Sequence, residues 1–482
     1  MSVLGEIWPF LLAAAIPVVQ GVSAVHVILH KRDVRAAVGW TALIWLAPLV
    51  GVAVYWLLGV NRIQRRARSL RHERPSYDRW IPDAPVGWDG LREVLPDELG
   101  HLNRLVPLGD RVTERPLLAG NRVDALVDGD QAYPEMLAAI EGATASVTLM
   151  SYIFDSGKVG DSFVRALGGA VGRGVEVRVL IDDVGARYST PRMAGRLRRA
   201  GARVAHFMPG WFPWRAPYVN LRNHRKIMVV DGRTAFTGGL NIRDEFWRGV
   251  SGSHFARDLH FRLEGPVVLE VQEVFAEDWT FTTGERLEGE EWFAPPLTTG
   301  PVLARGISDG PDIDYEKLQT MLLGALGVAR SSVRIITPYF LPDPALLSAL
   351  SIAALRGVEV EVIVPAQGNL ALVQWAATAQ MDQLAEKGVR IYSSPPPFDH
   401  SKLMVVDGCW TLIGSANWDP RSLQLNFEFN VECYDVTLGA AMERLFAERR
   451  DASSPVTLDH LASRGLPVRI RDGVARLFSP YL

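Results

Sequence analysis

An internal repeat constrains this chain of 482 residues more than any other feature. Apolar segments rich in β-branched residues occur twice, in the same order: 146–154, 174–183, 201–207 and 223–241, then 332–340, 357–366, 388–393 and 399–417. Such runs fit buried strands, and the stretches between them have helical patterns. Strands that alternate with helices predict an α/β fold with a largely parallel sheet in each half.

The last segment of each copy carries the motif His-x-Lys-x4-Asp. It occurs at His224, Lys226 and Asp231, and again at His400, Lys402 and Asp407. The offset between the copies stays at 176 residues from the histidines through Asn241 and Asn417. One such motif is weak, but two copies in equivalent strands favour a single active site shared by two pseudo-symmetric halves.

The residue types of the motif suit phosphate chemistry. His and Lys two residues apart on a strand project from the same face. A neutral imidazole can attack phosphorus, and the lysine charge can stabilise the phosphate oxygens in the transition state. A second histidine can give its proton to the leaving oxygen, and the motif Asp residues can accept hydrogen bonds that organise the site. We therefore predict a phosphohistidine intermediate with no metal and no cofactor.

The N-terminus is strongly apolar. Residues 8–29 and 36–60 contain no Asp, Glu, Lys or Arg, and each stretch is long enough to span a bilayer. A cleaved signal peptide is the alternative for the first stretch, but Glu6 stands where a basic residue is expected. The larger arginine cluster follows the second stretch, at 62–74, and this predicts that the bulk of the chain is cytoplasmic. The same cluster would suit anionic lipid headgroups.

These patterns divide the chain into four parts. They are a membrane anchor with two transmembrane helices (1–62), a connector (63–118), a first half (119–297) and a second half (298–482). The boundary between the halves falls in an acidic segment rich in Pro and Gly, which is typical of a linker.

Composition narrows the possible partners. The net charge of −3 gives no general attraction to nucleic acid, so we predict no nucleic-acid partner. Cys409 and Cys433 form no C-x-x-C pair, which predicts neither a disulfide framework nor a zinc site. Residues 306–310 match G-x-S-x-G, but Pro311 follows where a helix would have to begin, so we interpret them as a turn.

The first copy holds 11 extra residues just before its motif. They fall in a stretch that contains Phe207, Trp211, Phe212, Trp214 and Tyr218. We hypothesise a loop that reaches into the lipid headgroup region, with ordinary packing as the alternative. Three arginines flank the motifs and either contact lipid phosphates or stay solvated: Arg222, Arg225 and Arg421.

The paired motifs, together with 238–247, 257–268 and 415–432, resemble the phospholipase D superfamily. With the apolar N-terminus they resemble bacterial cardiolipin synthases, from about residue 36 to the C-terminus. The resemblance implies two phospholipase D-like α/β sandwich halves in a multi-pass protein of the bacterial inner membrane. It also implies the reaction, in which two phosphatidylglycerol molecules give cardiolipin and glycerol.

The resemblance further implies roles for single residues. His224 would be the nucleophile and His400 the general acid and base, or the reverse. Phosphate oxygens would be held by Lys226, Lys402, Asn241 and Asn417. Glu428 would orient one histidine, with Asp258 as a looser counterpart, because 17 residues separate Asn241 from Asp258 and only 11 separate Asn417 from Glu428. Ser415 offers a hydroxyl where the first copy has Gly239.

Other functions remain open at this point. A phospholipase D would use water in place of the second lipid, and another phosphatidyltransferase would use a different donor or acceptor. A nuclease of this superfamily fits the apolar N-terminus and the charge less well. An inactive scaffold that binds anionic lipid would not need both histidines. The oligomeric state does not follow from the sequence.

Overall fold

The computed structural model describes residues 3–31, 33–59, 91, 95–190, 192–209 and 221–479. The chain forms two compact units, Met1–Arg66 and Ala67–Leu482. Two of the predictions concern residues outside the described ranges: the arginine cluster at 62–74, and the aromatic residues Trp211, Phe212, Trp214 and Tyr218.

The first unit is helical. It contains α1 (Val3–His30), α2 (Val34–Leu46), α3 (Pro48–Val54) and a π-helical turn, η1 (Tyr55–Gly59). The continuous helix predicted over 36–60 is divided, because Pro48 cannot donate the backbone hydrogen bond that would continue α2. In the described part of the chain no helix combines the length and the apolarity that crossing a bilayer requires, so the prediction of two transmembrane helices is not supported.

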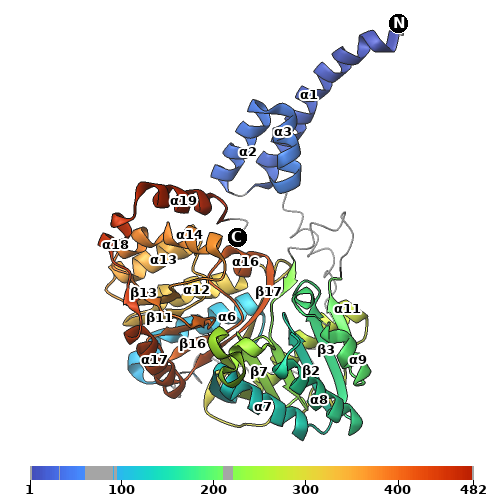
Figure 1. The fold of residues 1–482 in the computed structure, drawn as a ribbon. Coiled ribbons are helices and arrows are strands. Elements are labelled where there is room, and N and C mark those ends of the chain that lie inside the picture. Colours follow the sequence, from blue (N-terminus) through green and yellow to red (C-terminus); the bar gives the residue numbers. More distant parts are fainter. Residues whose placement is uncertain are drawn as a thin grey trace. The chain divides into compact units, whose positions relative to one another are not determined.

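The second unit is built on one mixed sheet that runs through both halves of the repeat and has 16 strands in the described residues (Figure 1). Its order is β18-β13-β12-β11-β15-β16-β17-β10-β1-β9-β7-β6-β2-β3-β4, and β5 pairs with β17 beside this path. The strands of the first half are β1 (Leu118–Val127), β2 (Ser146–Ser151), β3 (Glu176–Asp182), β4 (Arg203–Phe207), β5 (Arg222–Asn223), β6 (Ile227–Val230), β7 (Thr234–Gly238), β8 (Ala256–Arg257) and β9 (Leu259–Glu264). Those of the second half are β10 (Val302–Asp309), β11 (Ser332–Ile336), β12 (Glu359–Pro365), β13 (Arg390–Ser394), β14 (Phe398–Asp399), β15 (Leu403–Val406), β16 (Trp410–Gly414), β17 (Asn426–Tyr434) and β18 (Ser454–Pro455).

The two halves repeat one strand order. The order β9-β7-β6-β2-β3-β4 in the first half matches β17-β16-β15-β11-β12-β13 in the second. At the centre of the sheet β1 pairs antiparallel with β10, so that the halves share one continuous sheet. The predicted α/β fold with two related halves is confirmed.

The prediction of a largely parallel sheet is wrong. Among the strands that the structure describes, only β2, β3 and β4, and their counterparts β11, β12 and β13, run parallel to one another within each half. The motif strands β6 and β15 reverse at Asp231-Gly232 and Asp407-Gly408, where all four residues have φ between 50° and 63°. Asp-Gly at two positive φ values is typical of a tight hairpin turn, so the strand after each motif runs antiparallel.

Helices cover both faces of the sheet. The first half has α7 (Asp128–Gly142), α8 (Lys158–Gly172), α9 (Met193–Arg199), α10 (Arg248–Ser251) and α11 (Val267–Thr283), with the 3-10 turns η4 (Gly185–Tyr188), η6 (Asp244–Phe246) and η7 (Gly252–His254). The second half has α12 (Lys317–Val328), α13 (Pro344–Leu355), α14 (Ala371–Thr378), α15 (Met381–Ala385), α16 (Pro420–Gln424), α17 (Val436–Asp451), α18 (Leu458–Ser463) and α19 (Leu466–Leu477). In the first half α7, α8 and α9 share one apolar core with the strands, and α11 packs across the opposite face.

Part of the predicted connector belongs to the second half. η3 (Asp97–Arg104) and α6 (Leu105–Thr113) bury Leu102 and Leu105 in the same apolar core as Leu318 and Leu322 of α12. A 3-10 helix followed by a short α-helix has no sustained 3.6-residue period, and this is why the pattern escaped sequence analysis.

Candidate active site

The two motifs meet where the halves exchange short strands. β5 pairs in parallel with β17 of the other half, and β14 pairs with β8 in the same way. The backbone N–H of His224 donates to the carbonyl of Phe427 at 2.9 Å, and that of His400 donates to the carbonyl of Arg257 at 2.8 Å. Each motif histidine is therefore held beside a strand of the opposite half.

Each histidine also contacts a carboxylate of the opposite half. His224 Nδ1 lies 3.0 Å from Glu428 Oε1, and His400 Nδ1 lies 2.7 Å from Asp258 Oδ2. Both carboxylate side chains are fully buried, whereas the imidazoles keep 12% and 11% of their exposure. A carboxylate at Nδ1 favours the tautomer that is protonated there, which leaves the Nε2 lone pair for an electrophile.

Asp258 holds the place in the first half that Glu428 holds in the second. β9 and β17 are equivalent strands, and each carboxylate lies two residues before the residue that pairs with the glycine ending β7 or β16. The longer spacing from Asn241 to Asp258 is taken up by η6, α10 and η7. These insertions are outside the sheet, so they leave the register of the carboxylate unchanged.

The two carboxylates have different surroundings. Ser415 Oγ donates to Glu428 Oε2 at 2.5 Å. At the equivalent position in the first half, a Cβ on Gly239 would collide with the Asp258 carboxylate. Because aspartate is one carbon shorter than glutamate, its carboxylate takes the space that the serine side chain fills in the other half.

The two motif lysines lie buried beside the histidines. Lys226 Nζ donates to the carbonyl of His224 at 2.6 Å, and Lys402 Nζ donates to the carbonyl of His400. Within the part of the chain that the structure describes, neither ammonium group forms an ion pair with a carboxylate. Burial lowers the pKa of Lys226 to about 7 and that of Lys402 to about 8. A phosphate anion beside the two lysines would offset the free-energy cost of burying their positive charges, and would so favour their charged forms.

Burial and charge also set the protonation of the histidine pairs. Burial, together with the neighbouring lysines, lowers the pKa of His224 to about 4 and holds the pKa of His400 well below its usual value. Burial raises the pKa of Asp258 to about 8. Burial acts on Glu428 in the same sense, but His224, Lys226 and the Ser415 hydroxyl outweigh it and lower the pKa of Glu428. The two His–carboxylate pairs are therefore electrostatically unequal.

The two predicted asparagines lie in equivalent loops but make different contacts. Asn241 Oδ1 accepts from the backbone N–H of Ile153 at 3.1 Å. Asn417 Nδ2 donates to Ser422 Oγ at 3.1 Å. A role in holding phosphate oxygens stays a prediction for both residues.

The structure does not bring the motif aspartates to the histidines. Asp231 accepts hydrogen bonds from the backbone N–H groups of residues 144–146, and Asp407 accepts them from residues 330–332. Six residues, most of them in a strand, separate each histidine from its aspartate, a span of about 20 Å. His101 Nε2 also lies 2.6 Å from Asp407 Oδ2. These aspartates stabilise the turns at the far ends of β6 and β15.

Arg225 has a structural position, contrary to the hypothesis that it contacts lipid phosphates. Its side chain is fully buried, and Nη1 lies 2.6 Å from an oxygen of Asp278. Nη2 donates to Ser308 Oγ at 2.5 Å, and Nε donates to the carbonyl of Glu428. Ser308 lies inside β10, so the interpretation of residues 306–310 as a turn is also wrong.

Sequence reasoning missed Tyr152, which borders the site just after β2. Its ring lies 5.2 Å from the ring of His224 in an edge-on arrangement. Its hydroxyl accepts a hydrogen bond from Arg222 Nη1 at 2.7 Å. Arg222, which flanks the first motif, is thus held near the site. The position of Tyr152 at the carboxyl end of a parallel strand was the signal that could have identified it.

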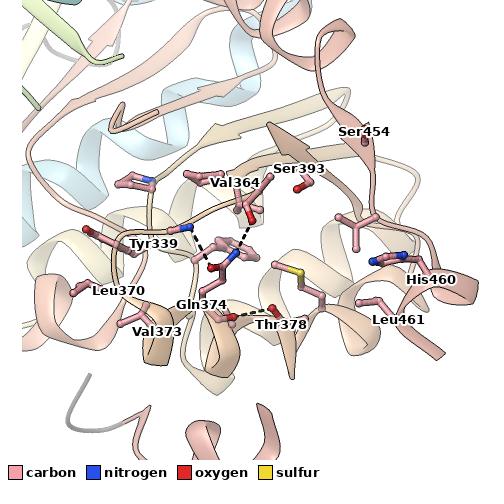
Figure 2. Close-up of a pocket in the computed structure, with 18 of the residues that line it drawn as sticks. Tyr339, Val364, Leu370, Val373, Gln374, Thr378, Ser393, Ser454, His460 and Leu461 are labelled. Carbon is pink, nitrogen blue, oxygen red and sulfur yellow. Dashed lines mark hydrogen bonds between the residues drawn. The ribbon is translucent and has the colours of Figure 1, made fainter. Parts of the chain in front are cut away.

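A cavity of about 390 Å³ lies at the carboxyl ends of β11, β12 and β13 (Figure 2). β15 starts at this same edge, because it runs antiparallel to β11. Two aromatic contacts connect the cavity to the site: the ring of Tyr339 lies 6.5 Å from that of Phe398, which lies 6.1 Å from that of His400.

The walls of the cavity are mainly apolar, with Phe340, Val364, Val373, Ala377, Met381 and Leu461 among them. The amide of Gln374, in the middle of Figure 2, is engaged at both ends: Nε2 donates to the carbonyl of Ala366 at 2.7 Å, and Oε1 accepts from the N–H of Gly368 at 3.2 Å. The cavity therefore offers hydrocarbon contact at the sheet edge where β15, the strand after His400, starts.

Comparison with known proteins defines the class. A family model described as "Cardiolipin synthase, PLD-like domain" matches residues 136–279 and 322–450. The crystal structure of phosphatidylserine synthase from Haemophilus influenzae Rd KW20 shares the fold, with a TM-score of 0.59 and 15% identity over 78% of this chain and all of that one. The duplicated α/β fold, with one His-Lys pair from each half, is that of a phospholipase D-like protein.

Relatives in sequence narrow the class to a family. The cardiolipin synthase of Geobacillus kaustophilus (strain HTA426) is 32% identical over 463 residues, which cover 95% of this chain and 91% of that protein. Cardiolipin synthase 2 of Bacillus cereus is 31% identical over 467 residues, which cover 95% and 88% of the two chains. The chain belongs to the cardiolipin synthase family of phospholipase D-like proteins.

Proposed function

We propose that this chain is a cardiolipin synthase, which transfers a phosphatidyl group from one phosphatidylglycerol molecule to another. The observation that carries the proposal is the crosswise pairing of His224 with Glu428 and of His400 with Asp258. It provides one nucleophile and one proton donor for a single phosphate, with two lysines beside them.

In the first step the Nε2 lone pair of His224 forms a bond to phosphorus. The bond from phosphorus to the glycerol oxygen breaks, and this oxygen takes a proton from His400. Lys226 and Lys402 stabilise the negative charge that develops on the phosphate oxygens. Free glycerol leaves, and a phosphatidyl group remains on His224.

In the second step neutral His400 takes the proton of a hydroxyl group of the second phosphatidylglycerol. The oxygen of that hydroxyl attacks phosphorus, and the bond from phosphorus to Nε2 breaks. Cardiolipin is released, and His400 regains the proton that it gave up. One phosphodiester replaces another, so the transfer needs little net energy.

The unequal carboxylates support His224 as the nucleophile. The lowered pKa of Glu428 favours an ionised carboxylate that accepts from His224 Nδ1–H and leaves Nε2 unprotonated. The raised pKa of Asp258, about 8, favours a proton shared between Asp258 and His400 at neutral pH. A proton kept on that pair is what the leaving glycerol oxygen requires.

The cavity at the carboxyl ends of β11, β12 and β13 supports a lipid substrate. Its apolar walls suit an acyl chain, and it shares the sheet edge of the catalytic histidine. The relatives described above are cardiolipin synthases, which agrees with such a substrate.

Purified full-length protein incubated with phosphatidylglycerol is expected to form cardiolipin and glycerol in equal amounts. Mass spectrometry of the lipids and an enzymatic glycerol assay measure both products. Phosphatidic acid as the main product would indicate a phospholipase D instead. No turnover with phosphatidylglycerol, but specific binding to it, would indicate a scaffold.

We also propose that the first unit associates with the bacterial inner membrane, with the catalytic unit on the cytoplasmic side. Large apolar side chains are exposed on its helices, among them Leu29 at 72%, Leu46 at 85% and Leu49 at 69%. The full chain is expected to sediment with membranes and to resist extraction by high salt. Recovery in the soluble fraction would contradict the proposal, and protease added outside spheroplasts that cleaves the catalytic unit would contradict its orientation.

A further inference from the structure

The C-terminal helix α19 exposes an apolar face. Its outward residues are Leu466, Ile470, Val474 and Leu477, which are 68%, 56%, 49% and 77% exposed. Each helical residue turns the chain by about 100°, so these four side chains lie within an arc of about 80°. A helix of a globular domain ordinarily turns such a stripe toward the core.

The opposite side of α19 holds it to the catalytic unit. Asp472 and Ala475 are buried, at 2% and 1% exposure. Asp472 pairs with Arg464 Nη1 at 2.7 Å, and the guanidinium of Arg471 lies 4.4 Å from the centre of the Trp375 ring. Figure 1 shows α19 along α14, on which it packs. The exposed stripe therefore belongs to a helix that is fixed in its orientation.

Arginines flank the stripe on both sides. On the same 100° rotation Arg469 and Arg476 fall on one side of the apolar arc, and Arg471 falls on the other. All three are exposed. An apolar face bordered by basic residues is the pattern of helices that lie in the interface of a membrane with anionic headgroups.

We propose that α19 is an interfacial helix that docks the catalytic unit on an anionic bilayer. Its apolar arc enters the boundary between headgroups and acyl chains, and Arg469 and Arg476 beside the arc meet lipid phosphates. α14, which carries α19, also forms a wall of the cavity at the carboxyl ends of β11, β12 and β13. Docking through α19 would thus hold this cavity close to the lipid.

The lipid contact is tested on the full chain reconstituted in bilayers, with a fluorescent label at Val474→Cys. The two native cysteines are buried and would not compete for the label. Bilayers contain lipids with brominated acyl chains, either phosphatidylcholine alone or phosphatidylcholine with phosphatidylglycerol. The label is expected to be quenched when phosphatidylglycerol is present, and Arg469→Glu is expected to raise the phosphatidylglycerol fraction needed.

A label at Ile352→Cys on α13 is the matched control, because Ile352 is 55% exposed on another helix of the same unit. No quenching at 474, or equal quenching at 474 and 352, would overturn the proposal.

Turnover gives a second measurement. The double variant Ile470→Ser, Leu477→Ser is expected to lose about tenfold in rate on bilayer phosphatidylglycerol but little on micellar substrate, because interfacial binding scales with buried apolar area. The matched variant Ile352→Ser, Leu355→Ser should keep both rates. The turnover measurement rests on the proposed function, and it cannot be made if the wild type forms no cardiolipin. The quenching measurement does not depend on the proposed function.

Discussion

Replacing His224 with alanine is expected to abolish cardiolipin formation, and replacing His400 is expected to lower the rate by about 100- to 10,000-fold. In the proposed mechanism the first variant lacks the atom that bonds to phosphorus, and the second lacks the group that protonates the leaving glycerol oxygen. Both side chains lie at the junction of the halves and keep some exposure, so neither truncation opens a large core cavity. Cardiolipin and glycerol release measure the loss, and thermal unfolding checks the fold.

An activated substrate separates the two roles. A phosphodiester with a p-nitrophenol leaving group does not need a proton donor, because p-nitrophenolate is a stable anion. His400→Ala should therefore still release p-nitrophenol in a burst and keep an acid-labile phosphoryl group on the protein, whereas His224→Ala should do neither. A covalent adduct in His224→Ala and none in His400→Ala would reverse the assignment. Adducts in both variants would contradict the two-histidine mechanism.

Glu428→Gln is expected to lower the transfer rate by about 1,000- to 10,000-fold, although it removes no atom that touches phosphorus. Glutamate accepts a hydrogen bond from His224 Nδ1–H, whereas the glutamine amide can donate its own N–H to Nδ1. The imidazole proton then moves to Nε2, and the nucleophilic lone pair is lost. Rates with phosphatidylglycerol and with the p-nitrophenyl substrate should fall together, because both need the same nucleophile.

Ser415→Ala is the matched control for the loss of the negative charge of Glu428. It removes the 2.5 Å hydrogen bond to Glu428 but keeps the carboxylate and its contact with His224. Loss of one hydrogen bond to a charged group should cost about tenfold in rate. If Glu428→Gln behaved like Ser415→Ala, orientation of His224 by an ionised carboxylate would be excluded, and Glu428 would be a structural residue.

Local sequence patterns predicted much of the fold and part of the candidate active site. The strands of the repeat follow from short β-branched runs, and the His-Lys pairs follow from a motif that recurs at a constant offset. What escaped prediction depends on contacts between distant segments. His224 and Glu428 are 204 residues apart, and His400 and Asp258 are 142 apart, so nothing local indicates which carboxylate meets which histidine.

The errors have local physical causes. Asp231 and Asp407 belong to the motif by spacing, but the extended strand between histidine and aspartate carries them to the far edge of the sheet. The sequence suggests that Arg225 is a surface cation. In the structure its side chain is surrounded by Asp278, Ser308 and the Glu428 carbonyl. The apolar run at 36–60 contains one proline, and that residue divides the helix.

The crosswise exchange of β5 and β14 bears on how such a chain arises. A protein with a single half would have to pair with a copy of itself, because its histidine would find a carboxylate only on the partner. In such a symmetric dimer one gene specifies both carboxylates, so both would be glutamate or both aspartate. Fusion of two copies removes that constraint. Glu428 with Ser415, and Asp258 with Gly239, are a divergence that fusion permits, and in the proposed mechanism it lets one side serve attack and the other proton transfer.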